Sequence, residues 1–247
     1  MTQGTSSIAN RVALVTGASR GIGKAIALAL ADAGAHVAVN YRAQSEAADA
    51  VCKSIKAMGR ECFAVRADVS LSSDVDRLVS AVEKGLGPVN ILVNNAGIGK
   101  IIPTDKITEE IWNEYLRVNL TSVFLVTQRV LPAMRAAQWG RIINLSSVAA
   151  QYGGAIGPHY AATKAGILGL TRSYALLFSK EGITSNAIAP ALIETDMIAG
   201  LPKELAARSP IGKIGSPDEV GRIAVLLAES SFITGQTINP NGGLYMA

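Results

Sequence analysis

The sequence predicts an α/β fold with one doubly wound parallel β-sheet and helices on both faces. Short apolar runs alternate with amphipathic stretches along nearly the whole chain, and this order builds strand–helix–strand units. The apolar runs are continuous, so both faces of each strand are expected to be buried, as in parallel sheets. A chain of 247 residues with 49% hydrophobic residues can form one large domain with a substantial core.

Each element follows from its local pattern. Strands are expected where apolar residues run together, at residues 11–16, 36–40, 62–67, 89–93, 141–145, 183–188 and 235–238. Helices are expected where apolar residues recur at helical spacing, at residues 21–34, 45–58, 72–85, 108–137, 158–180 and 217–228. Ser72 suits an N-cap, and Pro158 suits a first turn, where its missing N–H costs nothing. Residues 1–10 are expected to form a flexible polar tail before a single domain at 11–247.

Composition excludes several classes of protein. The net charge is +4 and the basic residues are scattered, so no nucleic-acid surface is expected. Cys52 and Cys62 have no metal-ligand spacing, which predicts free thiols in a reducing compartment and no metal site. The N-terminus lacks the apolar stretch of a secretory signal, and no run approaches the ~18 apolar residues of a membrane span. We expect a cytoplasmic protein, with an organellar matrix as the alternative.

A glycine-rich turn follows the first predicted strand. Residues 16–24 read TGASRGIGK, with glycines at 17, 21 and 23. Glycines allow a tight turn and a close approach of backbone N–H groups to a pyrophosphate, and the following helix directs its positive end to the same place. An ordinary turn between strand and helix is the alternative. Strand, glycines and helix together favour a nucleotide site.

Arginines near the second strand indicate which dinucleotide binds. That strand ends in Asn40, Tyr41 and Arg42, with no acid to accept hydrogen bonds from both ribose hydroxyls. Arg42 and Arg20 of the glycine turn can pair with a 2′-phosphate. NADP(H) is therefore favoured over NAD(H), unless these arginines simply face solvent.

Two further strand ends carry candidate cofactor contacts. Asp68 and Val69 follow the third strand, where a carboxylate could accept a hydrogen bond from an adenine amino group; an acid at a helix start explains Asp68 equally well. Residues 94–97, NNAG, follow the fourth strand. Small residues there let a flat ligand lie against the backbone, and a plain turn has a similar composition.

The chemistry is concentrated in Ser147, Tyr160 and Lys164. The lysine lies four positions after the tyrosine, so both side chains lie on one helix face. A cation beside a phenol stabilises phenolate and lowers a pKa that starts near ~10. This predicts a proton donor that is usable near neutral pH.

Taken in order, these motifs resemble the short-chain dehydrogenase/reductase family, whose fold is a Rossmann-type sheet. The matching segments are TGASRGIG at 16–23, DV at 68–69, NNAG at 94–97, Asn119, Ser147, YAATK at 160–164, NAIAP at 186–190 and IETDM at 193–197. The pattern is most similar to the 3-oxoacyl-[acyl-carrier-protein] reductases of fatty acid biosynthesis. The resemblance covers nearly the whole chain.

The resemblance implies a role for each catalytic residue. Tyr160 would protonate the oxygen of the substrate carbonyl, and Ser147 would hydrogen-bond the same oxygen. Lys164 would bind the nicotinamide ribose and lower the pKa of the phenol, and Asn119 would hold a water that links Lys164 to solvent. From its residue type alone, Asn119 is equally a helix-bending or capping amide. His159 is expected to form a pocket wall rather than to act as a base.

The resemblance also implies the remaining contacts. Ile193 and Thr195 would contact the nicotinamide amide, about 195–212 would form a substrate lid, and the enzyme would be a homotetramer with the 108–137 and 158–180 helices at interfaces. The segment at 195–212 is equally consistent with an ordinary amphipathic helix. The expected cofactor-binding residues are Gly17, Ser19, Arg20, Gly21, Ile22, Gly23, Asn40, Tyr41, Arg42, Asp68, Val69, Asn94, Ala96, Gly97, Tyr160, Lys164, Pro190, Ile193 and Thr195.

Some positions depart from the family pattern. Relatives often have glycine where Ala191 follows Pro190. Basic residues that dock an acidic carrier protein are replaced here by Gln138 and Glu181, and a glutamate would repel such a carrier. Arg135, Arg141 and Lys180 lie close by and could substitute.

The expected function is NADPH-dependent reduction of a carbonyl group in a 3-oxoacyl thioester. The alternative within enzymes is a reductase or dehydrogenase of free ketones, sugars or steroids without a carrier. The alternative outside enzymes is a non-catalytic NADP-binding sensor. The complete set of catalytic residues argues against a sensor, which needs no proton donor.

Overall fold

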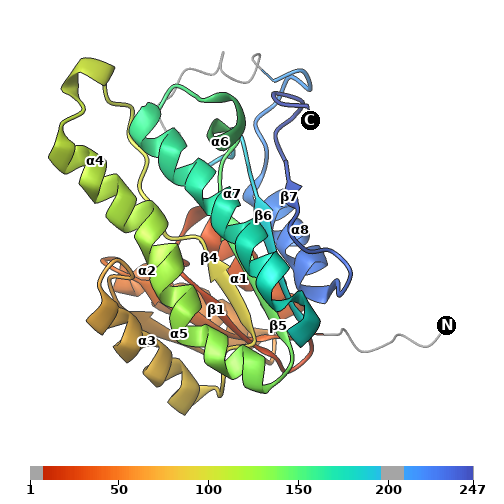
Figure 1. Ribbon diagram of the computed structural model, residues 1–247. Helices are drawn as coiled ribbons and strands as arrows, with labels where there is room; N and C mark the ends of the chain where they lie inside the picture. Colours follow the sequence, from red (N-terminus) through yellow and green to blue (C-terminus); the bar gives the residue numbers. More distant parts are fainter. Residues whose placement is uncertain (1–7, 196–208, 247) are drawn as a thin grey trace.

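The computed structural model describes residues 8–195 and 209–246 and has a seven-stranded parallel sheet at its centre, in the order β3-β2-β1-β4-β5-β6-β7 (Figure 1). Its strands are β1 (Val12–Val15), β2 (His36–Tyr41), β3 (Cys62–Arg66), β4 (Ile91–Asn94), β5 (Gly140–Leu145), β6 (Ile183–Ile188) and β7 (Thr237–Ile238). The chain order reverses between β1 and β4, and the crevice at the carboxyl ends of these strands is where such sheets bind ligands. The predicted fold class is confirmed.

Helices cover both faces of the sheet (Figure 1). They are α1 (Gly21–Asp32), α2 (Ser45–Ala57), α3 (Ser72–Gly85), α4 (Glu109–Tyr115), α5 (Ser122–Ala136), α6 (Ala149–Tyr152), α7 (Pro158–Phe178) and α8 (Pro217–Glu229). One core cluster unites α1, α2 and α8 with one face of the sheet, and a second unites α3, α5 and α7 with the other. Within β1, Ala13 and Val15 join the first cluster whereas Val12 and Leu14 join the second, so the strand is buried on both faces as predicted.

The long helical region at 108–137 is confirmed, but its centre is not α-helical. A π-helical stretch, η2 (Leu116–Thr121), connects α4 to α5. Such stretches are rare and frequently mark functional sites. Asn119 lies inside it, and periodicity alone cannot predict this local widening.

Some local predictions are wrong. Ser72 is the first residue of α3, and the N-cap is Leu71, which makes no side-chain capping bond. The short helix α6 and the 3₁₀ turns η1 (Thr104–Lys106) and η3 (Ser179–Glu181) were not expected. Elements this short carry too little periodicity to be recognised.

The prediction of free thiols is also wrong. Cys52 of α2 and Cys62 of β3 form a disulfide, with Cα atoms 5.2 Å apart. Both cysteines are buried in the first core cluster. Cysteine spacing alone does not reveal this pairing, because the approach of α2 to the start of β3 is set by the tertiary fold.

The chain enters the core before residue 11. Ile8 is fully buried, and the backbone N–H of Asn10 donates to the carbonyl of Gly34. Of the expected lid, residues 196–208 lie outside the described part of the chain, and the described end is joined to the C-terminal region by a bond from Ile211 N to Gly242 O.

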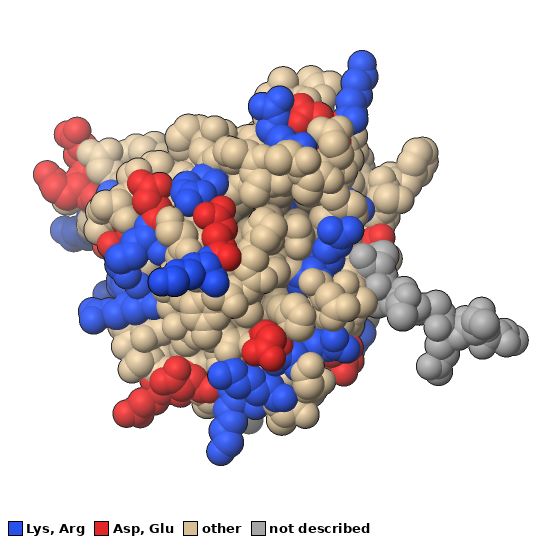
Figure 2. All heavy atoms as spheres, turned by 90° about the horizontal axis from the view of Figure 1, so that it is seen from below, with Lys and Arg blue, Asp and Glu red and all other residues tan. Residues whose placement is uncertain are grey.

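Surface charge is mixed. On the face seen in Figure 2, Lys and Arg side chains lie interspersed with Asp and Glu side chains over a largely uncharged surface. This face therefore offers no continuous basic surface of the kind that binds nucleic acid. Among the described helices, none combines the length and apolarity needed to cross a membrane.

Gly182 and Gly59 provide a matched test of how the turn before β6 packs against Gln138, which follows α5. Both have left-handed backbones, with φ of +71° and +76°. A Cβ at Gly182 would lie 2.2 Å from the Gln138 carbonyl oxygen, whereas one at Gly59 would meet no atom within 4 Å. We expect Gly59→Ala to lower the free energy of unfolding by about 1 kcal/mol, from backbone strain alone. Gly182→Ala should cost at least about 3 kcal/mol because backbone must move.

Urea unfolding followed by circular dichroism measures both values. Equal losses in the two variants would contradict the packing described here.

Candidate active site

The glycine turn after β1 is shaped for an anion. Gly17 and Gly21 have φ of +62° and +55°, a conformation that glycine adopts without strain. Helix α1 starts at Gly21 with no side-chain cap and no acid in its first turn. Its first N–H groups and its positive end are therefore directed at the same place, as a pyrophosphate requires.

Asn40 supports this turn from β2. Its side-chain oxygen accepts the N–H of Gly17 at 3.2 Å, and its carbonyl accepts the N–H of Ala18 at 2.9 Å. Its amide nitrogen donates to the carbonyls of Val65 and Ala67 at 3.3 and 3.1 Å. Asn40 is thus a buried brace between the turn and β3, although a cofactor contact was expected.

Thr16 and Asn95 join the turn to the end of β4, and sequence reasoning missed both roles. The Asn95 amide donates to the carbonyls of Thr16 and Gly17 at 2.9 and 3.0 Å. The Thr16 hydroxyl accepts the N–H groups of Asn95 and Ala96 at 2.9 and 3.0 Å. A Cβ at Gly23 would lie 2.4 Å from the Asn95 amide nitrogen, so this glycine is required by packing. We call these bonds the Asn95 clamp.

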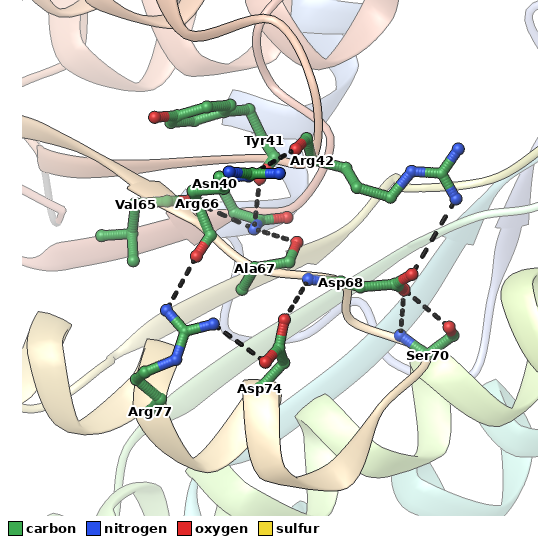
Figure 3. A network of polar contacts seen from close by, with 10 residues as sticks. All are labelled: Asn40, Tyr41, Arg42, Val65, Arg66, Ala67, Asp68, Ser70, Asp74 and Arg77. Atoms are coloured by element: carbon green, nitrogen blue, oxygen red, sulfur yellow. Dashed lines mark hydrogen bonds and ion pairs between the residues drawn. The ribbon is translucent and has the colours of Figure 1, made fainter.

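Asp68 lies at the end of β3 and is strongly hydrogen-bonded (Figure 3). One carboxylate oxygen accepts the hydroxyl of Ser70 at 2.6 Å and its N–H at 3.0 Å. Burial opposes ionisation, but these bonds and the charges of Arg42 and Arg117 outweigh it and hold the pKa of Asp68 below its usual value. The second oxygen faces the Arg42 guanidinium at 3.9 Å. Val69 beside it is buried in the core.

Of the residues at the end of β4, Asn94 supports the sheet and Gly97 lets the backbone lie close to the catalytic side chains. The Asn94 amide donates to Thr127 and Asn144 at 3.1 and 2.9 Å, so its side chain belongs to a buried network. A Cβ at Gly97 would lie 3.1 Å from the Asn119 side-chain oxygen and 3.7 Å from the Lys164 ammonium. Gly97 therefore keeps the backbone close to both groups.

Ser147, Tyr160 and Lys164 converge between β5 and α7. Ser147 hydrogen-bonds the Tyr160 phenol, and the Lys164 ammonium lies 5.6 Å from the centre of the phenol ring. That ammonium donates to the Leu145 carbonyl at 2.8 Å. Ser146 is turned away and donates to the Lys164 carbonyl at 2.8 Å, so it fixes the helix. The geometry thus favours Ser147 as the serine that assists the phenol.

Burial controls the ionisation of the pair. It raises the pKa of the Tyr160 phenol, although the hydrogen bond from Ser147 lowers it. The expectation of an acidified phenol is therefore wrong, because burial raises the pKa of Tyr160 more than the hydrogen bond from Ser147 lowers it. Lys164 is only 5% exposed, and burial lowers its pKa to about 8. A phenol in this state keeps its proton at neutral pH and can donate it.

Asn119 is fully buried and fixes the loop beside Lys164. Its side-chain oxygen accepts the N–H of Ile98 at 2.8 Å, and its amide donates to the Ile98 carbonyl at 2.9 Å and to the Thr163 hydroxyl at 3.4 Å. Both amide hydrogens are thus committed to the protein. The side chain acts first as a brace for the backbone at Gly97 and Ile98.

His159 lies beside the catalytic tyrosine in an apolar wall. Its ring meets the Tyr115 ring edge to face, with centroids 4.2 Å apart, and burial lowers its pKa. Neither ring nitrogen has a hydrogen-bond partner among the described residues. A neutral imidazole without a polar partner fits the expected wall better than a base.

The end of β6 completes the crevice. The Pro190 carbonyl accepts the N–H of Val148 at 2.9 Å, which joins this end to the segment after Ser147. Ile193 is buried. The methyl of Thr195 would lie 3.4 Å from a Cβ at Gly21, so Thr195 faces the glycine turn. The candidate site therefore combines an anion-binding helix end with a protonated phenol, an assisting hydroxyl and a buried cation.

Comparisons with known proteins agree with this arrangement. Residues 11–206 match the family described as short chain dehydrogenase. The chain is 42% identical over 243 residues to the 3-oxoacyl-[acyl-carrier-protein] reductase FabG of Staphylococcus epidermidis, covering 96% of this chain and 100% of the relative. It is 43% identical over 244 residues to the acetoacetyl-CoA reductase of Shinella zoogloeoides, covering 96% and 99%.

A crystal structure from Sinorhizobium meliloti 1021, of a protein provisionally called a short-chain alcohol dehydrogenase, has a TM-score of 0.91. It is 36% identical in sequence, and the match covers 96% of each chain. The likeness thus extends over sequence, fold and nearly the full length of these relatives. The chain belongs to the short chain dehydrogenase family and is an oxidoreductase.

Proposed function

We propose that this protein is an NADPH-dependent reductase that converts a 3-oxoacyl thioester to the 3-hydroxyacyl thioester. The observation that carries the proposal is a protonated phenol, bonded by Ser147 and backed by the buried Lys164, at the strand ends that adjoin an anion-binding glycine turn. The relatives named 3-oxoacyl-[acyl-carrier-protein] reductase and acetoacetyl-CoA reductase support the substrate class.

The residues present fit a dinucleotide. The uncapped first turn of α1 would hold the pyrophosphate, and Asp68 offers an ionised acceptor at the end of β3. Arg42 and the absence of an acid at the end of β2 favour NADPH over NADH. When bound, the reduced nicotinamide supplies the hydride that reaches the carbonyl carbon.

The protein supplies the proton and the polar environment. Negative charge develops on the carbonyl oxygen in the transition state, and preorganised donors stabilise it. The hydroxyl of Ser147 donates to this oxygen while Tyr160 transfers its phenolic proton to it. The phenolate that remains is stabilised by the nearby Lys164 ammonium, which can return a proton.

The surface near α7 favours a substrate that is not presented by an acidic carrier protein. Arg135, one possible docking residue, donates to both oxygens of Glu181, at 2.7 and 3.1 Å. Arg141, another of the three possible docking residues, is 4% exposed and donates to backbone carbonyls of Ala228, Gly140 and Gly182. Both cations are committed within the chain, so a coenzyme A thioester is the second candidate substrate.

A homotetramer remains part of the proposal. Apolar side chains on the two helical regions expected at interfaces are exposed, including Leu176 at 83% and Leu177 at 62% on α7 and Phe124 at 46% on α5. Exposed apolar side chains grouped on neighbouring helices suit an interface between copies of a chain. Figure 1 shows α5 and α7 side by side on the outside of the sheet.

Removing the phenolic hydroxyl tests the mechanism. Tyr160→Phe should lower kcat for ketone reduction by about 100-fold or more, since a positioned proton donor typically contributes that much. NADPH affinity should stay within about twofold, because the ring is retained. Tyr174→Phe, which removes a hydroxyl bonded to Gln128, is the control. Steady-state kinetics measures kcat, and titration with NADPH measures cofactor affinity. Near-full turnover by Tyr160→Phe would contradict the role of Tyr160 as proton donor.

Lys164 makes a prediction about pH. Its pKa of about 8 in the folded protein lies below the ordinary 10.5. Below pH 8 the folded protein carries the buried charge, and the cost of burying it lowers the free energy of unfolding in full. As pH rises from 8 toward 10.5 the folded protein releases this proton, and the free energy of unfolding rises. We expect Lys164→Met to abolish activity yet raise the free energy of unfolding at pH 7 by roughly 1–2 kcal/mol, after loss of the bond to Leu145. Wild-type reduction should decline as pH rises through about 8.

Urea unfolding at pH 7 and pH 10.5 measures the difference in free energy of unfolding between Lys164→Met and the wild type. This difference should be smaller at pH 10.5. Lys56→Met on the exposed face of α2 is the matched control. A destabilised Lys164→Met at pH 7 would show that the charge is compensated in the fold.

The two thioester classes can be separated by kinetics. We expect efficient reduction of acetoacetyl-CoA, with plain ketones slower and a 3-oxoacyl carrier protein no better than the coenzyme A thioester. Glu181→Lys, which releases Arg135, should raise kcat/KM for the carrier-linked substrate severalfold and leave the coenzyme A thioester unchanged. Glu46→Lys makes the same charge change on α2. A strong wild-type preference for the carrier would refute the argument from Glu181.

A further inference from the structure

Ser70, which lies between β3 and α3, receives a hydrogen bond from a distant part of the chain. The donor is the Arg117 guanidinium in the π-helical stretch η2, 47 positions away in the sequence. Within residues 8–195 and 209–246, this guanidinium makes no second hydrogen bond or ion pair. Ser70 is only 6% exposed whereas Arg117 is exposed, so a surface cation reaches inward to one buried hydroxyl. The bond joins η2 to the carboxyl end of β3.

The Ser70 hydroxyl in turn orients the carboxylate of Asp68. A hydroxyl has one hydrogen to donate. Because the oxygen of Ser70 accepts from Arg117, its hydrogen is left for Asp68, to which it donates at 2.6 Å. The N–H of Ser70 donates to the same carboxylate oxygen at 3.0 Å (Figure 3). The backbone of Asp68 is held separately, by a 2.8 Å bond from its N–H to Asp74. Arg117 and Ser70 thus fix how the carboxylate is turned.

The second carboxylate oxygen of Asp68 is available to a ligand. It faces the Arg42 guanidinium at 3.9 Å, and in the described part of the chain it accepts no hydrogen bond. Burial raises the pKa of Asp68, but the bonds from Ser70 and the charges of Arg42 and Arg117 lower it below its ordinary value. Asp68 therefore presents an ionised oxygen with a fixed direction at the end of β3, and this oxygen can accept an N–H group.

The stretch η2 lies between two loops of the cofactor crevice. Asn119 follows Arg117 by two positions, and residues two apart on a helix do not face each other. The Asn119 side chain bonds to the backbone of Ile98, after β4, whereas Arg117 bonds to Ser70, after β3. Both loops follow carboxyl ends of parallel strands, where such sheets bind dinucleotides. Arg117 therefore connects to the expected cofactor site and not to a remote surface.

We propose that Arg117 is a positioning residue for base recognition: through Ser70 it directs the free oxygen of Asp68 at the amino group of the cofactor's adenine. An amino group donates hydrogen bonds and a carboxylate only accepts them. An oriented carboxylate therefore favours adenine over a base that carries a carbonyl oxygen at the same place. Arg117 acts through Ser70 and need not touch the base. The inference rests on the proposed use of NADPH and adds the residue that orients Asp68.

The test is isothermal titration of the intact protein with NADPH and with reduced nicotinamide hypoxanthine dinucleotide phosphate, in which a carbonyl oxygen replaces the adenine amino group. The wild type should bind NADPH about 10-fold more tightly or better, as one hydrogen bond to a charged group implies. Arg117→Met should reduce this preference to less than about threefold and leave binding of the hypoxanthine analogue within about twofold. Arg117→Lys should restore part of the preference, because an ammonium can donate to Ser70 without the planar fork.

Two further variants separate orientation from general support. Ser70→Ala should lose the preference as Arg117→Met does, and the double variant should lose no more, since the two residues act in series. Arg129→Met is the matched control. Arg129 on α5 pairs with Glu83 of α3 at 3.0 Å, so it links neighbouring parts of the same layer without reaching Asp68. Its loss should leave the preference for adenine unchanged.

The remaining results would contradict different claims. A wild-type protein that binds neither dinucleotide would overturn the proposed function. A wild type that binds both equally would keep the proposed function but refute base recognition by Asp68, and with it the role of Arg117. A preference for NADPH that survives in Arg117→Met would refute the role of Arg117 alone. Equal weakening of both dinucleotides in Arg117→Met would refute it too, because Arg117 would then only support the fold.

Discussion

The buried ammonium of Lys164 is the constraint on which the active site depends. A cation that leaves water must be compensated, yet in the described residues it has one bond, to the Leu145 carbonyl. Its helix is fixed to β5 by the Ser146 bond to the Lys164 carbonyl, and the backbone at Gly97 is brought close by Asn119. The fold thus holds a charge that weakens it, in the place where the reaction needs a positive neighbour for a phenolate.

The interior between the sheet and helices α5 and α7 is held by hydrogen bonds between neutral side chains rather than by acids. Asn94 and Asn144 are bonded to each other and to Thr127 and Thr171, so β4 and β5 are joined to α5 and α7 without a buried carboxylate. An acid beside Lys164 would pair with the lysine and reduce its effect on Tyr160. The residue that the π-helical stretch places near the ammonium is instead Asn119, whose neutral amide leaves the charge available to the phenol.

Much of the fold and of the site could be predicted from the sequence, for physical reasons. A continuous apolar strand such as Val12–Val15 indicates burial on both faces and hence helices on both sides of the sheet, and closely spaced glycines indicate a turn such as that at Gly17. The position of Tyr160 relative to Lys164 follows from helix geometry. Contacts between segments far apart in the chain could not be predicted. The Asn95 clamp requires knowledge of which strand ends meet, and the disulfide of Cys52 requires knowledge of how α2 packs against the start of β3.

The pKa of Tyr160 shows why such knowledge matters for chemistry. Sequence reasoning weighed only the neighbouring cation and concluded that the phenol would be acidic. In the structure, burial acts on both partners: it raises the pKa of the phenol and lowers that of the lysine. Burial therefore moves the two pKa values apart, and the ammonium gives up its proton more readily than the phenol does. The phenolate left after each reduction is then a stronger base than the lysine amine, so proton transfer from Lys164 to Tyr160 is favourable and reloads the donor after every turnover. The spacing of the motif brings the two groups together, and their shared burial sets the direction of this transfer.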